Sequence, residues 1–367
     1  MGDAPLAARI DEADPDRRTA MPSPRTNDTV PTPVDTPTTI PTTTMKAIVY
    51  DEFGGPEVLD LREVERPALE DDRVLVKVHA AAINPYDWHM IRGLPYIARA
   101  SVGLRSPKSP IPGADFAGVI EAVGADVTAF AKGDEVFGSG PGTFAEYVTA
   151  REQSVVVKPE HVSFEQGASV VMAGMTALQG LRDRGNLQPG ENVLINGASG
   201  GVGTFAVQIA KAMGAQVTAV CSSRNAATVR SVGADHVVDY TQEDFTRSGN
   251  RYDVIFDVVS TQSMSGVRRS LTDDGRYVNA GAVKMGNWIG PFTHLARVKL
   301  GSSMGKPTMM SMLAKGSQTD LVVLRDYLDS GEIVPVIDAK YPLAEVPEAM
   351  AHLETMHARG KVVITIS

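Results

Sequence analysis

Four glycines stand within seven residues of the chain, at positions 197, 200, 201 and 203. They follow the apolar run 193–195 and precede a run from Thr204 whose pattern predicts a helix. Glycine leaves room where another group must come close to the backbone, and the free N–H groups that open a helix attract an anion. A strand, a glycine turn and a helix in this order predict a binding site for the pyrophosphate of a dinucleotide. A tight turn without a ligand is the alternative.

The residues after the next strand indicate which dinucleotide would bind. The strand-like run 216–221 is followed by Ser222, Ser223 and Arg224. NAD sites usually carry an acidic residue about 20 residues beyond the glycines, but no Asp or Glu occurs between residues 204 and 234. Two hydroxyls and a guanidinium suit a 2′-phosphate instead. We therefore predict NADPH as the cofactor, with a solvated arginine at a helix start as the alternative role for Arg224.

Two patterns of predicted secondary structure divide the chain beyond residue 44. Between residues 45 and 168, short apolar runs alternate with glycine-containing turns, which is typical of a mainly antiparallel, barrel-like domain. After Ser169, strands alternate with helices of about ten residues, which predicts βαβ units and a parallel sheet. The strands expected in this part are 192–195, 216–221, 236–238, 252–259, 276–280 and 360–366, and the helices are 204–213, 226–232, 262–271, 321–330 and 346–357.

The first 44 residues differ from the rest of the chain. They hold eight prolines, ten threonines and no aromatic residue. Such a segment buries too little apolar surface to offset the entropy lost on ordering, so we predict a disordered tail over 1–44.

Composition excludes several classes of function. The 367 residues carry a net charge of −9 without a visible basic face, which argues against a nucleic-acid partner. Cys221 is the sole cysteine, so no internal disulfide forms and a reducing cytoplasm is the expected location. No apolar run approaches the roughly 18–20 residues that span a bilayer, and we expect no membrane partner.

A longer composite pattern runs from Met45 to Ser367. It consists of Met45-Lys46-Ala47, Gly54-Gly55-Pro56-Glu57-Val58-Leu59, Asn84-Pro85-x-Asp87, Gly113-Ala114-Asp115-Phe116-Ala117-Gly118, Phe144-Ala145-Glu146-Tyr147, Gly190-Glu191-x-x-Leu194, Ala198-Ser199-Gly200-Gly201-x-Gly203, Gln208-x-x-Lys211 and Gly360-Lys361-Val362-Val363. This pattern resembles the medium-chain dehydrogenase/reductase superfamily, in its zinc-independent quinone oxidoreductase (zeta-crystallin-like) branch.

The resemblance implies an α/β fold with two domains. A GroES-like, mainly antiparallel β catalytic domain would span 45–170 and return at 309–367. A Rossmann domain with a doubly wound parallel sheet would span 171–308 and bind NADPH. The resemblance also implies a homodimer.

The resemblance assigns a cofactor role to residues of both halves. Ser199, Gly201 and Val202 would meet the pyrophosphate, and Tyr240 would lie near the adenosine phosphate or be a half-buried strand-end tyrosine. The full set expected to bind the cofactor is Ser199, Gly200, Gly201, Val202, Gly203, Ser222, Arg224, Tyr240 and Lys361.

Comparison of this sequence with the zinc-dependent members of the same superfamily predicts that no metal is bound. Zinc-dependent relatives hold catalytic zinc through a cysteine, a histidine and a further cysteine or acid. Asn84 stands at the first cysteine position, and Gly113-Ala114-Asp115 stands where those relatives have Gly-His-Glu. One cysteine cannot build a four-cysteine structural site, and no two of the seven histidines are spaced at i, i+4.

Without a Lewis acid, hydride transfer requires an acceptor carbon that is already electrophilic. Quinones and α,β-unsaturated carbonyls (enones) meet this requirement, so they are the expected substrates. The candidate catalytic residues are Asn84 as a hydrogen-bond donor, Tyr86 as a proton donor and Asp87. Their alternatives are a turn-forming asparagine, protonation by water, and an aspartate that braces the loop. Two other functions stay open: a zinc-type alcohol dehydrogenase or carbonyl reductase, and a non-catalytic NADPH-binding sensor.

Overall fold

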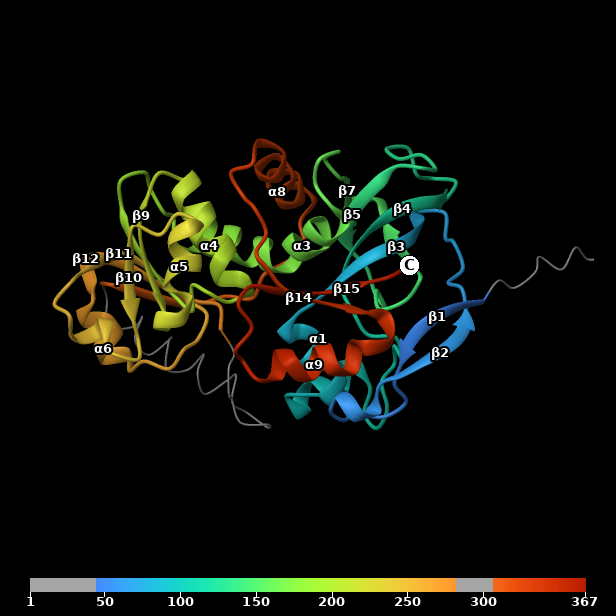
Figure 1. Ribbon diagram of the computed structural model, residues 1–367, viewed down its shortest axis with the longest axis horizontal. Helices are drawn as coiled ribbons and strands as arrows, with labels where there is room; N and C mark the ends of the chain where they lie inside the picture. Colours follow the sequence, from blue (N-terminus) through green and yellow to red (C-terminus); the bar gives the residue numbers. More distant parts are fainter. Residues whose placement is uncertain (1–43, 282–305) are drawn as a thin grey trace, which may run out of the picture. The chain divides into compact units, whose positions relative to one another are not determined.

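Two large sheets and one small sheet make up the framework of the computed structural model, which describes residues 44–281 and 306–367 (Figure 1). The small sheet pairs β1 (Thr44–Val49) with β2 (Asp60–Glu65) in antiparallel register. The tail expected over 1–44 lies outside the described residues except for Thr44, which begins β1.

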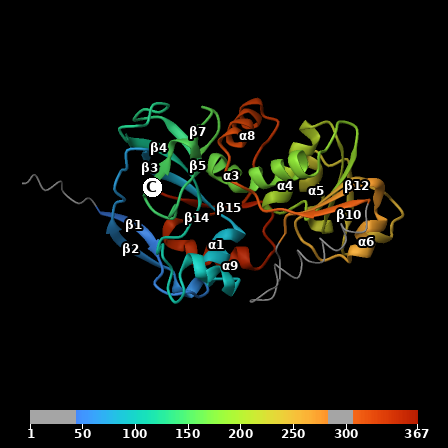
Figure 2. The same cartoon turned by 180° about the vertical axis from the view of Figure 1, so that it is seen from behind.

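The first large sheet is mainly antiparallel and joins both ends of the chain. Its strands are β3 (Arg73–Ile83), β4 (Asp115–Val123), β5 (Glu135–Ser139), β6 (Tyr147–Arg151), β7 (Val155–Val157), β14 (Ile337–Pro342) and β15 (Lys361–Thr365). They follow the order β14-β15-β3-β4-β5-β7, with β6 paired to β3. β15 runs antiparallel to β3 and parallel to β14 (Figure 2). The last strand of the chain therefore lies directly beside the residues that lead to Asn84.

The second large sheet is parallel throughout. Its strands are β8 (Asn192–Asn196), β9 (Gln216–Cys221), β10 (His236–Asp239), β11 (Tyr252–Asp257), β12 (Leu271–Asn279) and β13 (Thr308–Ser311). The order β10-β9-β8-β11-β12-β13 is that of a doubly wound Rossmann sheet, which confirms the expected fold class. Because such a sheet is covered on both faces, β8 reads as an unbroken apolar run at 193–195. β13 extends the sheet to Ser311, and the domain boundary expected at 308 stays a prediction.

The helices agree with the expectation in the second half and depart from it in the first. They are α1 (Pro85–Arg92), α2 (Arg99–Val102), α3 (Phe164–Leu178), α4 (Gly201–Ala212), α5 (Ala226–Ser231), α6 (Met264–Arg269), α8 (Gln318–Ser330) and α9 (Val346–Glu354). α4 begins at Gly201, three residues before the expected start at Thr204. The helix expected over 262–271 is shorter, because β12 already begins at Leu271. α1, α2 and α3 were not predicted.

Helix α3 connects the two large sheets. Its start is fixed by a capping box, in which Ser163 Oγ accepts from Gln166 N and Gln166 Oε1 accepts from Ser163 N. It packs on β3, β4 and β5 and also on α4 and α8. One apolar cluster accordingly continues from Phe137 of β5 through Val171 to Phe205 of α4. α3 thus connects the helix that follows the glycine loop to the mainly antiparallel sheet.

Candidate active site

Close packing within the protein requires glycine at two positions of the loop. Gly197 has a φ of +86°, and a Cβ there would meet the methyl groups of Val258 and Val259. A Cβ on Gly203 would lie 2.1 Å from the carbonyl oxygen of Gly197. Helix α4 starts directly after the N-cap Gly200, so its first backbone N–H groups have no partner within the helix. A bare backbone thus leads into a helix N-terminus, an arrangement that can face an anion, and the binding of a pyrophosphate here stays a prediction.

A side-chain hydrogen bond joins this loop to the residues after β9. Asn225 Nδ2 donates to Ser199 Oγ at 3.0 Å. Asn225 directly follows Arg224, and its backbone N–H donates to the carbonyl of Ser222 at 2.9 Å. Ser222 is buried and Arg224 is exposed. Tyr240 is 59% exposed, and its N–H donates to Cys221 O at the end of β9. The structure thus brings the residues expected at the 2′-phosphate and the adenosine next to the glycine loop.

One carboxylate near this edge escaped the sequence analysis. Asp239 ends β10 and is paired in register with Cys221, the last residue of β9. Its carboxylate accepts from the N–H and the hydroxyl of Thr241 at 2.9 and 2.7 Å. Hydrogen bonds from Thr241 and Ser223 lower the pKa of Asp239. These donors stabilise the carboxylate of Asp239 as an anion close to the predicted phosphate position, and they offset part of its charge.

Four buried polar side chains meet at the start of α1. Asn84 Nδ2 donates to Asp115 Oδ2 at 2.9 Å and to Ala82 O at 3.2 Å. Lys361 Nζ donates to Asn84 Oδ1 at 2.5 Å. Asp87 Oδ2 accepts from the backbone N–H of Asn84 at 2.8 Å. Asn84, Asp87 and Asp115 are at most 2% exposed, and Lys361 is 3% exposed. Both amide hydrogens of Asn84 are therefore occupied within the protein, and the ammonium of Lys361 donates to two oxygens. The cofactor role expected for Lys361 stays a prediction.

Burial controls the protonation of this network. It raises the pKa of Asp87 to about 7 and that of Asp115 to about 6, while Lys361 lowers the pKa of both carboxyls. Burial lowers the pKa of Lys361, and the two carboxylates oppose that shift. Oδ1 of Asp87 and Oδ1 of Asp115 are buried without a hydrogen-bond partner among the described residues. The charge of Lys361 thus offsets part of the negative charge of the two carboxylates. One oxygen of each carboxyl remains able to accept a hydrogen bond.

Tyr86 lies outside this network. It occupies the first turn of α1, next to Asp87, and it is 48% exposed. Burial of the other half of the side chain, and the charge of Asp87, raise the pKa of Tyr86. Its hydroxyl therefore keeps its proton at neutral pH, as a proton donor must.

A second buried polar cluster lies at the carboxyl ends of β8, β11 and β12. Asp257 is fully buried, and its Oδ1 accepts from Asn196 Nδ2 and from the backbone N–H groups of Val259 and Ser260, at 2.8–2.9 Å. Tyr277 OH donates to its Oδ2 at 3.0 Å. Ser260 is held at a φ of +62°, which is uncommon for a residue with a side chain. The sequence analysis missed this cluster. The available signal was a polar residue at the end of successive parallel strands, the edge where such sheets bind ligands.

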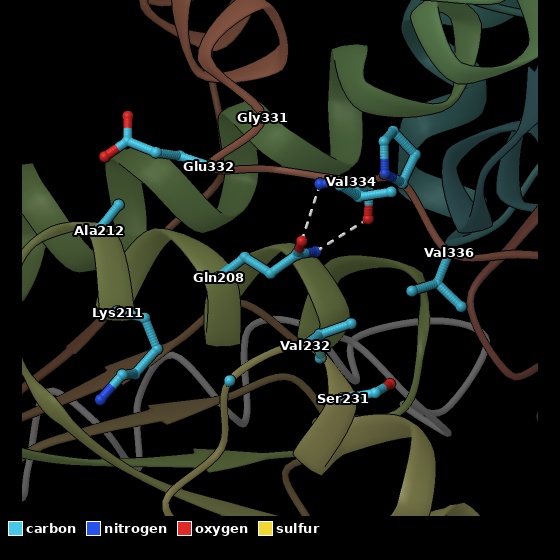
Figure 3. A pocket seen from close by; sticks show the side chains of 11 residues that line it. Gln208, Lys211, Ala212, Ser231, Val232, Gly331, Glu332, Val334 and Val336 are labelled. Carbon is cyan, nitrogen blue, oxygen red and sulfur yellow. Dashed lines mark hydrogen bonds between the residues drawn. The ribbon is translucent and has the colours of Figure 1, made fainter.

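A surface cavity of about 670 Å³ lies away from the glycines, along the second half of α4. It is lined by Gln208, Lys211, Ala212, residues 231–233 at the end of α5 and the segment 331–336. Figure 3 shows Gln208 crossing it to the backbone of Val334 through two hydrogen bonds. Lys211 instead pairs with Asp235. None of the predicted catalytic or cofactor-binding residues lines this cavity. Through these bonds, Gln208 and Lys211 of the motif Gln208-x-x-Lys211 connect α4 to other segments of the chain.

Comparison with known proteins places the chain in a family. The model of the alcohol dehydrogenase GroES-like domain matches residues 70–160, and the model named zinc-binding dehydrogenase matches residues 232–364. The human quinone oxidoreductase is 34% identical over 336 residues, which cover 88% of this chain and 98% of that protein. The chain belongs to the medium-chain dehydrogenase/reductase superfamily, in its quinone oxidoreductase branch. This oxidoreductase uses a pyridine nucleotide, as its family does.

Two further relatives of this oxidoreductase are informative. The chloroplastic NADPH-dependent alkenal/one oxidoreductase of Arabidopsis thaliana is 33% identical over 335 residues, covering 87% of this chain and 79% of that protein. The solved structure of the quinone oxidoreductase from Coxiella burnetii superimposes with a TM-score of 0.79 at 30% identity, covering 89% of this chain and all of that one. The likeness therefore extends through both large sheets.

The zinc-binding name of one family model does not fit the side chains of this oxidoreductase. Ala114 offers no ligand atom, and both polar atoms of the Asn84 amide are hydrogen-bonded within the protein. Over residues 44–281 and 306–367, no group of three or more His, Cys, Asp and Glu side chains is placed to hold a metal ion. Tetrahedral zinc requires such a set. In the same ranges, no helix combines the length and the apolarity needed to cross a membrane.

Proposed function

We propose that the protein is an NADPH-dependent, zinc-independent reductase of quinones or enones. The observation that carries the cofactor choice is the exposed guanidinium of Arg224, which makes no hydrogen bond or ion pair with any residue in the described ranges. It is one residue away from Asn225, which hydrogen-bonds to the glycine loop. The names of the human and Arabidopsis relatives support the class of acceptor.

The chain would provide binding and orientation for this reaction. Bound NADPH would supply a hydride to an electrophilic carbon of the acceptor. The bare backbone at Gly200, Gly201 and Gly203, with Ser199 and Val202, would hold the pyrophosphate. Ser222 and Arg224 would hold the 2′-phosphate, and Tyr240 would lie beside the adenosine. Such fixed donors position the reacting atoms without a metal.

The proton that completes the reduction would come from Tyr86 or from water. The Tyr86 hydroxyl is partly exposed, and its raised pKa keeps it protonated. Asn84 and Asp87, which flank it in the chain, are hydrogen-bonded to each other, so we propose that they fix the start of α1. A Tyr86→Phe variant tests the assignment, because a lower kcat with unchanged NADPH binding supports Tyr86, and an unchanged kcat supports water.

The decisive experiment is a panel of quinones and enones assayed with NADPH and NADH in parallel. The proposal expects acceptor-dependent oxidation of NADPH, with NADH the poorer donor. Cofactor binding without oxidation by any acceptor would instead support a non-catalytic sensor. Stoichiometric zinc in the purified protein, together with alcohol oxidation, would support the zinc-type alternative that the family-model names suggest.

We further propose a homodimer that forms along β13. This strand lies at the edge of the parallel sheet among the described residues, and an edge strand offers unpaired backbone groups. Light scattering of the purified protein tests the oligomeric state. The cytoplasmic location also stays a prediction, since relatives include a chloroplastic protein.

A further inference from the structure

The ammonium of Lys361 is a buried cation within the Asn84 network. Lys361 is the first residue of β15, and its Nζ donates to Ile83 O at 3.0 Å and to Asn84 Oδ1 at 2.5 Å. A lysine that is only 3% exposed is costly unless anions offset its charge. The charges of Asp115 and Asp87 raise the pKa of Lys361, and the amide of Asn84 links the ammonium to Asp115.

The position of this cation is informative. Asn84 links it to Asp115, the first residue of β4. In this chain the two residues are joined by the bond from Asn84 Nδ2 to Asp115 Oδ2, and Asp115 Oδ2 also accepts from Met172 N at 3.1 Å. The ammonium of Lys361 and the carboxylate of Asp115 are thus held on the two sides of one amide.

We propose that Lys361 is a positioning residue whose buried ammonium fixes the amide of Asn84 at the start of α1 and offsets the charge of Asp115 across that amide. Asn84 is then held on both sides, with its nitrogen on Asp115 and its oxygen on Lys361. This arrangement determines the orientation of the turn that carries Tyr86.

The aliphatic stem of Lys361 has a second neighbour. A Cβ on Gly201 would lie 3.0 Å from Lys361 Cδ, so the stem runs against the glycine loop while the ammonium reaches the Asn84 network. A substitution can therefore remove the contribution of the ammonium while the contact of the stem with Gly201 is kept. A methionine keeps most of the stem beside Gly201 and removes the charge.

The test uses four full-length proteins: the parent, Lys361→Met, Asp115→Asn, and the double variant. Lys340→Met is the matched control, because Lys340 lies on the neighbouring strand β14 and pairs at the surface with Glu165. Three quantities are measured: the urea midpoint of unfolding, the Kd of NADPH by its fluorescence, and kcat with the best acceptor of the panel. The kcat measurement rests on the proposed function, and the other two do not require turnover.

Removing the charge alone should leave Asp115 buried without its cation. We expect Lys361→Met to lower the urea midpoint and to reduce kcat about 100-fold, because a small displacement of positioned groups has effects of this size. The Kd of NADPH should change less than about threefold, since the stem remains. Lys340→Met should leave all three quantities near the parent values.

Adding Asp115→Asn should restore most of the lost stability, because the introduced amide oxygen can still accept from Asn84 and Met172 and the neutral side chain no longer needs a counter-charge. If Lys361→Met alone does not fold, recovery of a cooperative transition in the double variant supports the proposal. A double variant no more stable than Lys361→Met, or a Lys361→Met protein indistinguishable from the parent, would overturn it. If the parent reduces no acceptor, the proposed function fails, and the unfolding data still decide the role of Lys361.

Discussion

The side-chain amide of Gln208 forms two hydrogen bonds with the backbone of one distant residue, Val334. Gln208 Oε1 accepts from Val334 N at 2.8 Å, and Gln208 Nε2 donates to Val334 O at 3.2 Å (Figure 3). Gln208 belongs to α4, which starts at the glycine loop, and Val334 belongs to the connection between α8 and β14. The pair therefore ties the cofactor-side helix to the chain that returns to the mainly antiparallel sheet.

Replacing Gln208 by alanine should destabilise the protein by about 1–3 kcal/mol, because Val334 would lose both hydrogen bonds. Urea unfolding monitored by tryptophan fluorescence measures this loss. Gln188→Ala is the control: Gln188 is exposed, and its side chain bonds only to Asn186 among the described residues. Equal stabilities for the two variants would show that the pair contributes nothing measurable.

Asp257 should be among the residues least tolerant of substitution. Asp257→Ala would leave four donors without their acceptor, including the buried side chains of Asn196 and Tyr277. We expect a loss on the order of 3–5 kcal/mol in the free energy of unfolding. Asp273→Ala, at a side chain that is 97% exposed, should change it by less than about 0.5 kcal/mol. A similar small change at Asp257 would contradict this reading of the cluster.

The Asn84 network should make stability fall as pH rises through the weakly acidic range. The pKa of Asp115 is about 6 in the folded protein against an ordinary value of 3.8, so the folded state binds this proton more tightly than the unfolded chain does. The stabilising contribution of Asp115 is therefore complete below 3.8, is lost as pH rises to about 6, and stays constant above. Asp87 acts in the same direction up to about 7.

Asp115→Asn isolates most of this effect, because carboxyl groups outside the network cancel in the difference between parent and variant, whereas Asp87, whose pKa is raised by the charge of Asp115, does not. Between about pH 4 and pH 7, the stability of the parent relative to Asp115→Asn should fall by an amount on the order of 3 kcal/mol. Urea unfolding across this pH range measures it. A difference that rises with pH would mean that the carboxyl is stabilised as an anion.

Local pattern predicted the parts of this site that are contiguous in sequence. The glycine turn, the strand before it and the residues after β9 all lie within one βαβ unit, so their spacing alone indicated a dinucleotide site. The Asn84 network was only partly predictable, because Lys361 lies 277 positions away in the sequence and no local pattern indicates that its ammonium reaches Asn84. Helix α3 was missed since it is buried on most of its surface, which hides the helical period.

Cofactor preference gives the sharpest test of the phosphate assignment. Arg224→Ala should raise the KM for NADPH about 10- to 100-fold, because a charged hydrogen bond to the phosphate would be lost. The KM for NADH, which lacks the 2′-phosphate, should change little. Arg230→Ala is the control, since Arg230 is an exposed arginine on the adjacent α5.

Asp239 makes a second variant informative: Asp239→Asn should lower the KM for NADPH by removing a negative charge near the phosphate. If the parent enzyme already preferred NADH, Arg224 would not be a phosphate ligand, and Asp239 would become the candidate partner of the ribose hydroxyls.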